Sequence, residues 1–260
     1  MKLKDILCAE TFQDEVRIAL KSSYGKRSVS DINAVGGAEF EISLCKAINR
    51  VLPVGHVCLT KKAISEDYKF PEDFMKTIES DAFHPYSASD LFVFDADNNF
   101  IDAVSLKTAM SDGNPKPFLH NDPNNQVHDF VSSPSEESKA IGQVFIVTYN
   151  IRKSEVESYY YDQSVESLTS VFECSKKNKH GDLVYSGKNF GINRQVLKIT
   201  NRNSTTRKAQ SSFNRGVVLD GTFIKDVLVP RGIIENPHSF TLHHEEIKLQ
   251  SINELTLGRR

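Results

Sequence analysis

Asp90 and Lys107 are the two residues of this sequence whose types and spacing most favour chemistry. They lie within ASDLFVFDADNNFIDAVSLKTA, in which two apolar runs flank an Asp-Asn-Asn turn. If Asn98 and Asn99 are the two turn residues, the runs pair as a β-hairpin in which the numbers of opposed residues sum to 197. In that register Asp90 lies directly opposite Lys107, so a carboxylate and an ammonium group meet across two strands.

Ser105 lies on the same face of this hairpin, because strand side chains alternate with a period of two. Directly opposed Cβ atoms in a sheet are roughly 5 Å apart. Carboxylate, hydroxyl and ammonium groups therefore converge at one end of one sheet face. A single cross-strand Asp–Lys pair at a sheet rim is also a common structural feature, so the hairpin alone leaves both interpretations open.

A helix is expected just before the hairpin, over residues 37–52 (GAEFEISLCKAINRVL), and Pro53 stops it. At about 100° per residue Glu41 falls within the apolar face, whereas Glu39 falls on the opposite, solvent-facing side. A carboxylate turned toward a core is costly unless something pairs with it. Glu41 is therefore either a buried acid neutralised by a lysine or by backbone donors, or a further acid delivered to the site of Asp90; we favour the second interpretation.

These residues resemble the core of the PD-(D/E)XK nucleases, the family that includes most type II restriction endonucleases. That core has a helix with a glutamate, a strand that begins with Asp, a tight turn, and a strand that ends in acid-x-Lys. Here it reads Glu41, Ser89-Asp90 and Ser105-Leu106-Lys107. The resemblance covers roughly residues 36–150, with the run QVFIVTYNI as the next core strand.

Two positions depart from the family pattern. Ser89 stands where Pro is usual, which is harmless, and Ser105 stands where the second acid is usual. A serine variant occurs in some restriction enzymes that recruit their second acid from elsewhere in the fold. The candidates for that acid here are Glu41, which we favour, and Asp112, Asp122 and Glu136.

The resemblance implies hydrolysis of phosphodiester bonds in double-stranded DNA with Mg²⁺ as cofactor and Mn²⁺ as a substitute. Hard divalent cations prefer oxygen ligands, so the expected ligands are Asp90, Glu41 and the main-chain carbonyl of Leu106, together with DNA oxygens. Ser105 contributes only through its hydroxyl or a bound water. Lys107 is expected to stabilise charge on the attacked phosphate and to orient or deprotonate the water.

The net charge of −2 hides a strong asymmetry. Residues 176–215 hold ten Lys or Arg against one acid, so this segment carries +9 and the remainder −11. Asn, Gln, Ser and Thr are interspersed, and this mix suits contacts to phosphates and base edges. A solvated surface is the alternative explanation of such a run. We expect the segment to bind DNA through six residues: Arg194, Lys198, Arg202, Arg207, Lys208 and Arg215.

The pattern of the whole chain predicts an α/β (α+β) fold, in which a mixed central β-sheet is flanked by helices around a restriction-endonuclease-like core. Helical spacing over residues 3–21 and a polar, Pro-rich stretch at 110–134, expected to be a long loop, complete the outline. At 260 residues we expect a single nuclease domain, 1–260, with the catalytic core at about 36–150 and the basic DNA-binding region at about 176–215.

The chain is expected to be cytoplasmic. No apolar run approaches the roughly 20 residues of a membrane helix, and the amino terminus carries acids through its apolar pattern, unlike a secretory signal. The cysteines are scattered without metal-ligand spacing, so we expect reduced thiols rather than zinc ligands or disulfides: Cys8, Cys45, Cys58 and Cys174.

Together these features predict a magnesium-dependent type II restriction endonuclease with a cognate DNA methyltransferase in the same system. A homodimer is expected, because one chain holds one such centre and a two-fold axis would place two centres on the antiparallel strands of a duplex. The alternatives are a repair or recombination nuclease of the same fold, a catalytically inactive DNA-binding protein, and a protein unrelated to nucleic acids whose charge clustering is accidental.

Overall fold

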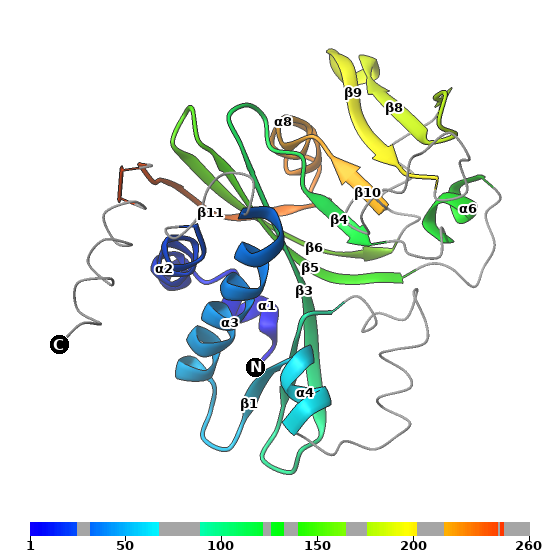
Figure 1. The fold of residues 1–260 in the computed structure, drawn as a ribbon. Coiled ribbons are helices and arrows are strands. Elements are labelled where there is room, and N and C mark those ends of the chain that lie inside the picture. Colours follow the sequence, from blue (N-terminus) through cyan, green and yellow to red (C-terminus); the bar gives the residue numbers. More distant parts are fainter. Residues whose placement is uncertain are drawn as a thin grey trace.

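Two β-sheets and a layer of helices make up the fold, seen here in a computed structural model (Figure 1). The first sheet has the order β1-β2-β3-β5-β6-β11, and the second has the order β4-β10-β9-β8-β7. β3 and β5 pair in parallel while their other neighbours pair antiparallel, so the predicted mixed sheet flanked by helices is confirmed. The structure describes residues 1–24, 32–67, 89–121, 126–132, 140–164, 176–201, 216–243 and 245–246.

The first sheet is the structural centre of the molecule. Its middle strand β5 is buried on both faces, which explains the nearly continuous apolar run that predicts it. Val144 and Ile146 face one side, and Phe145 and Val147 face the other. The six strands are β1 (Val57–Thr60), β2 (Leu91–Phe94), β3 (Phe100–Ser111), β5 (Ala140–Asn150), β6 (Glu155–Ser164) and β11 (Glu235–Thr241).

The amino-terminal helices cover one face of this sheet. The expected single helix over residues 3–21 is wrong, because Ala9 has extended backbone and divides the segment. The first piece is fixed to the sheet by Asp102, whose Oδ2 accepts the Leu3 amide at 2.9 Å. The four elements of this layer are α1 (Leu3–Leu7), η1 (Glu10–Phe12), α2 (Gln13–Tyr24) and α3 (Ile32–Val51). α3 confirms the helix expected over residues 37–52, but it begins five residues earlier and ends one residue earlier.

The second sheet packs on the opposite face, where Val217 and Leu219 share a buried cluster with Val144 and Ile146. Two strands of this sheet, β8 and β9, come from the basic segment. The second sheet consists of β4 (Phe118–Asn121), β7 (Lys176–Lys177), β8 (Leu183–Gly187), β9 (Ile192–Ile199) and β10 (Gly216–Leu219). Short helices complete this side: α4 (Lys61–Asp67), α6 (Gln126–Ser132), η2 (Lys188–Phe190), α8 (Gly221–Phe223) and the π-helical turn η4 (Ile224–Leu228).

The expectation of a long loop over residues 110–134 is wrong in part. This stretch contains β4 and α6, whose Leu119 and Val127 are fully buried in the apolar cluster that also holds Val144 and Val217. Within the described residues, no helix is both long enough and apolar enough to cross a membrane. Cys8, Cys45 and Cys58 are free thiols as expected, and Cys174 lies outside the described residues.

Candidate active site

The hairpin that carries the site pairs two residues away from the expected register. Leu91 lies opposite Val104, so opposed residue numbers sum to 195 rather than 197. The cause is the turn, in which Asp95 Oδ1 accepts the amides of Asp97 and Asn99 at 2.9 and 2.8 Å and lengthens the connection. Asn98 adopts a positive φ of 63°, a conformation that asparagine tolerates better than most residues. A shift of two residues keeps Asp90, Ser105 and Lys107 on their predicted face. A bulge nearer the turn pairs Phe94 with Phe100 and so places Phe100 on the face of Phe92 and Ala103, against the expected register.

Asp90, Ser105 and Lys107 come together at the end of this hairpin. Asp90 Oδ2 accepts hydrogen bonds from the Ser105 hydroxyl at 3.0 Å and from the Lys107 ammonium group at 3.4 Å. The Lys107 ammonium group also donates to the Ser105 hydroxyl. The Lys107 side chain is 11% exposed and the Asp90 side chain 31% exposed, so the cluster is recessed but open to solvent.

The position of Asp90 follows from the way in which β2 ends. Its amide donates to the Val104 carbonyl at 2.9 Å, the last ladder bond of β2 with β3. The next amide on that edge, Leu106, donates to Asp90 Oδ2 at 2.6 Å instead of to a strand carbonyl. The amide and carbonyl of one strand residue point to the same edge, so the Leu106 carbonyl also points toward the Asp90 side.

Glu41 reaches the same place from α3. Phe40, Leu44 and Ile48 on the neighbouring turns are fully buried against β2 and β3, and this packing points Glu41 toward the strand edge. Burial raises the pKa of Glu41 to about 7; the charge of Asp90 adds to the rise and the charge of Lys107 opposes it. Glu41 therefore lies within electrostatic reach of Asp90 and Lys107, on the inward side of the helix that its apolar pattern predicts.

Glu39 differs from its expected position. It is half-buried rather than solvent-facing, because α2 packs along this side of α3, where the Ser22 and Ser43 hydroxyls lie 2.9 Å apart. The α2–α3 contact was not readable from the helix pattern of α3 alone, since that pattern gives a face but not its neighbours.

The donor set at the site suits a hard cation. Within the described residues no donor reaches Asp90 Oδ1, and the Glu41 carboxylate and the Leu106 carbonyl are further oxygen atoms of the kind that such a cation prefers. No group of three or more His, Cys, Asp or Glu gathers at ligand spacing in the described part of the chain. The expected metal ligands are thus two carboxylates and one carbonyl, which leaves other positions to water and DNA oxygens.

The other candidates for the missing acid do not join this cluster in the described structure. Asp112 follows the end of β3, five residues beyond Lys107 and roughly 16 Å along the strand direction. It is exposed, and too distant to share a ligand with Asp90. Asp122 and Glu136 lie outside the described residues.

Sequence reasoning missed the elements that support Asp90 from the other side. The Asp90 carbonyl accepts the Lys61 amide at 3.0 Å, at the start of α4. Thr60 caps this helix by accepting the Ala63 amide at 3.1 Å. Asn49 of α3 holds the outer edge of β1: its Nδ2 donates to the Cys58 carbonyl and its Oδ1 accepts from the Cys58 amide, each at 2.8 Å. The sequence does carry a signal for these elements: the short apolar run at residues 57–59 is followed by Thr60, a residue type that often begins a helix.

The expected DNA-binding residues are only partly described. Arg194 forms a 2.8 Å ion pair with Asp220, a buried carboxylate that also caps α8, so Arg194 has a structural role. Lys198 is half-buried, and its burial lowers its pKa, with the charge of Lys116 adding to that effect. The remaining four lie outside the described residues: Arg202, Arg207, Lys208 and Arg215.

The outer face of the second sheet nevertheless carries a row of basic side chains. Lys176 pairs with Val184, which pairs with Lys198, so the two lysines share the face turned away from the first sheet. Lys177 and Lys188 are exposed nearby in the chain. Asp182, the acid of this segment, is buried and accepts the Asn201 amide at 2.9 Å. The exposed charge of the described segment is therefore positive.

Comparison with family models, curated proteins and solved structures found no match.

Proposed function

We propose that the chain is a cytoplasmic, magnesium-dependent type II restriction endonuclease that hydrolyses phosphodiester bonds of double-stranded DNA at a short specific site. The observation that carries the proposal is the meeting of Asp90, Ser105 and Lys107 at an open strand edge. Glu41 adds a second carboxylate from a different element. The resemblance to the PD-(D/E)XK nucleases rests on the same four residues and supports the same reaction.

Lys107 would act on the attacked phosphate. Its ammonium group is held by Asp90 and Ser105, so little side-chain freedom remains to be lost when substrate arrives. A positive charge fixed beside the phosphorus stabilises the negative charge that develops on the phosphate oxygens during attack. Because the Lys107 side chain is 11% exposed, this charge is only weakly screened by water.

Asp90, Glu41 and the Leu106 carbonyl would hold Mg²⁺, with Mn²⁺ as a substitute. When bound, the cation lowers the pKa of a water molecule and neutralises phosphate charge. Asp90 binds its protein donors through Oδ2, which leaves Oδ1 as the ligand atom. Glu41 must give up its proton to serve as a ligand, because its pKa lies near 7 in the metal-free protein. Ser105 would support the site through its hydroxyl.

Two partners complete the proposal. A homodimer would place two Asp90–Lys107 centres on the two strands of a duplex. A cognate DNA methyltransferase would protect the DNA of the same cell from cleavage. The basic outer face of the second sheet, with Lys176 and Lys198, would contribute phosphate contacts.

Cleavage of two DNA preparations tests this function. Long DNA amplified in vitro carries no methylation, whereas genomic DNA from the source cells carries the protection of the system. The proposal predicts discrete fragments from amplified DNA in Mg²⁺ and none from source DNA. Equal cleavage of both, or preference for branched or nicked DNA, would instead favour the repair nuclease, and retention of DNA without cleavage the inactive DNA-binding protein.

A further inference from the structure

Two buried thiols lie between the elements that carry the candidate active site. The Cys45 thiol of α3 donates to the Cys58 carbonyl of β1 at 3.2 Å, and the two thiol groups are also hydrogen-bonded to each other. Cys58 is 1% exposed and Cys45 is 9% exposed. Two oxidisable groups are therefore in contact, and neither takes part in the proposed reaction.

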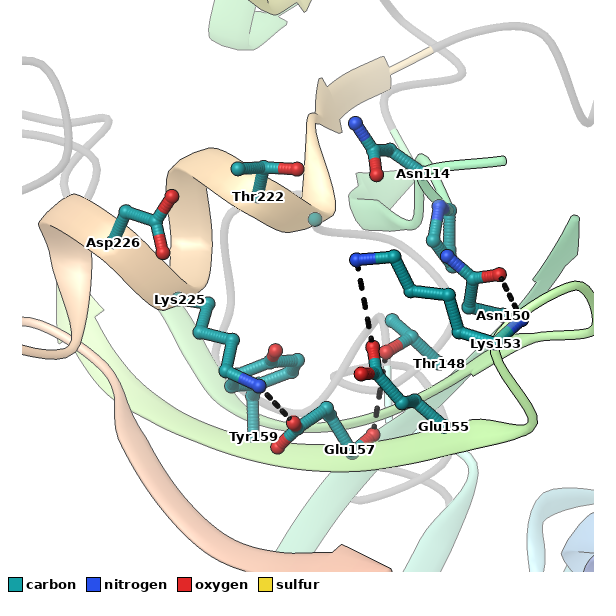
Figure 2. Close-up of a pocket in the computed structure, with 12 residues that line it drawn as sticks. Asn114, Thr148, Asn150, Lys153, Glu155, Glu157, Tyr159, Thr222, Lys225 and Asp226 are labelled. Carbon is teal, nitrogen blue, oxygen red and sulfur yellow. Dashed lines mark hydrogen bonds and ion pairs between the residues drawn. The ribbon is translucent and has the colours of Figure 1, made fainter. Parts of the chain in front are cut away.

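The polar pocket of about 240 Å³ on the face of the first sheet opposite α1–α3 has no comparable unused chemistry. Figure 2 shows that its two lysines already pair with acids: Lys225 with Glu157, and Lys153 with Glu155 at 3.9 Å. The two thiols differ, because together they can lose two hydrogen atoms and form a covalent bond.

Asn49 keeps the two cysteines together. It bonds the amide and the carbonyl of Cys58, each at 2.8 Å, and its Nδ2 lies 3.8 Å from Cys45 Sγ. The same Nδ2 lies 3.0 Å from the Cys45 carbonyl. Helix and strand are thus fixed around the two sulfur atoms, so that bond formation between them would lose little conformational freedom.

The pair is linked to both carboxylates of the proposed metal site. Glu41 lies one helical turn before Cys45 on the same face of α3, and the charge of Glu41 acts on both thiols. On the other side, the Lys61 amide, directly after β1, donates to the Asp90 carbonyl at 3.0 Å. A change in the spacing between α3 and β1 therefore moves Glu41 relative to Asp90.

We propose that Cys45 and Cys58 are a redox pair, which a hydroperoxide converts to an intramolecular disulfide that weakens cation binding at the neighbouring site. The disulfide itself is independent of the proposed nuclease function, whereas its effect on the cation rests on that function. The reduced form would persist in a reducing cytoplasm, where disulfides are transient and respond to oxidants.

Cys45, the more exposed thiol, reacts first. The hydrogen bond with Cys58 lowers the pKa of Cys45, which favours the thiolate. This thiolate attacks one peroxide oxygen, the O–O bond breaks, an alcohol or water leaves, and Cys45 becomes a sulfenic acid. The Cys58 sulfur then attacks the Cys45 sulfur and expels hydroxide, which takes the Cys58 proton and leaves as water. Two electrons have passed from the thiols to the hydroperoxide.

The disulfide would change the geometry of the site through α3. Its two sulfur atoms are about 2.05 Å apart, closer than two hydrogen-bonded thiols. Bond formation therefore draws α3 and β1 together at Cys45 and displaces Glu41, one turn away. Mg²⁺ demands near-ideal positions of its oxygen ligands, so the oxidised protein should bind it more weakly.

Peptide mapping by mass spectrometry of the full chain, treated with hydrogen peroxide, tests the bond without any measure of nuclease activity. The intact mass should fall by that of two hydrogen atoms, Cys45 should be joined to Cys58, and dithiothreitol should restore the thiols. Cys8→Ser removes a half-buried thiol outside the pair; it is the matched control and should still form the bond, whereas Cys45→Ser should not. Absence of the Cys45–Cys58 bond from the wild type overturns the proposal, and this result does not depend on the folding of any variant.

Calorimetric titration with Mg²⁺ provides the second arm. The oxidised wild type should bind the ion several-fold more weakly than the reduced protein, and dithiothreitol should restore the affinity. Equal affinity of the two forms overturns the link between the cysteine pair and the site. If the reduced protein neither binds Mg²⁺ nor cleaves DNA, the nuclease function is refuted, and the peptide map still decides whether the two cysteines form a redox pair.

Discussion

The Leu106 amide donates to Asp90 Oδ2 at 2.6 Å, so the Asp90 carboxylate takes the place of a strand neighbour at the point where β2 ends. The same oxygen also accepts from Ser105 and Lys107. Asp90 therefore holds the end of the hairpin together, in addition to the role of cation ligand through Oδ1 that we propose for it. A substitution at this position has structural and catalytic consequences that must be separated.

Asp90→Ala should lower the free energy of unfolding by about 2–4 kcal/mol, because it removes the acceptor of three donors and leaves the recessed Lys107 ammonium group without its carboxylate. Asp90→Asn, which keeps an acceptor oxygen, should cost less while still abolishing cleavage. Urea unfolding measures the stability of both variants. Asp97→Asn, an exposed acid in the turn of the same hairpin, is the control and should change neither stability nor cleavage. Full stability in Asp90→Ala would show that the hydrogen bonds to Oδ2 contribute little.

Glu41→Gln should stabilise the metal-free protein at alkaline pH. The Glu41 pKa is about 7 in the folded chain, against about 4.3 in an unfolded one. Between these values the folded state binds the additional proton, so the stability of the wild type falls as pH rises through this range. The glutamine does not titrate and avoids this loss, which after discounting for partial exposure is on the order of 2 kcal/mol at pH 8.

Unfolding measured at pH 4 and pH 8 checks this prediction, with the exposed Glu10→Gln as control. The Glu41→Gln advantage should be present at pH 8 and absent at pH 4, where the folded wild type is protonated at this position and the unfolded chain largely so. An equal effect at both pH values would mean that the carboxylate is not buried beside Asp90.

Mg²⁺ binding should become weaker as pH falls below 7. In the proposed site the cation binds the ionised Glu41 carboxylate, and each pH unit below the Glu41 pKa of about 7 reduces the ionised fraction about tenfold. Calorimetric titration in buffers of different ionisation enthalpy should also detect release of a proton near pH 7. Glu41→Gln should bind the ion less tightly, with an affinity that no longer changes between pH 6 and pH 8. A wild-type affinity independent of pH would remove Glu41 from the ligand set.

The double variant Lys176→Gln/Lys177→Gln should flatten the salt dependence of duplex binding. Both side chains are exposed on β7, and removing one phosphate contact reduces the magnitude of the logarithmic slope by about 0.9. Lys2→Gln/Lys46→Gln, an exposed pair elsewhere on the surface, is the matched control. Arg194→Ala is a poor probe of DNA binding, because it also breaks the ion pair with buried Asp220. A slope that stays the same would place the DNA on another surface.

The periodicity of the sequence predicted which face of a strand or helix carries each of the site residues. Strand alternation put Asp90, Ser105 and Lys107 on one face, and that result survived a register shift because the shift was by an even number of residues. The shift itself arose in the Asp95 turn, whose side-chain hydrogen bonds depend on local geometry that the dipeptide Asn-Asn does not reveal. The helical spacing likewise predicted that Glu41 faces inward, and in the structure its carboxyl group is largely buried.

Packing between elements could not be read in the same way. Glu39 was predicted to face solvent, because the apolar pattern of α3 does not reveal that α2 packs beside it. The break at Ala9 divides a segment whose apolar spacing is continuous. β4 and α6 were hidden in a polar stretch, because burial of Leu119 and Val127 depends on β10 and β9, far away in sequence.

Homodimer formation should appear when the protein engages its site. Two chains of 29.2 kDa bound to one duplex sediment as a 2:1 complex, and supercoiled plasmid should pass to linear product without accumulation of open circles. A 1:1 complex that accumulates open circles first would indicate a monomer that cuts the strands in turn.

The proposed nuclease function is tested most directly by cleavage of long, amplified DNA in Mg²⁺ by the wild type, Lys107→Ala and the exposed control Lys46→Ala. We expect discrete fragments from the wild type and from Lys46→Ala, and loss of these fragments when the metal is chelated. Lys107→Ala should fold and bind DNA but cleave at least about 100-fold more slowly, the equivalent of about 3 kcal/mol of transition-state stabilisation. Absence of cleavage by the wild type would refute the nuclease function, and near-normal turnover by Lys107→Ala would refute the role of Lys107.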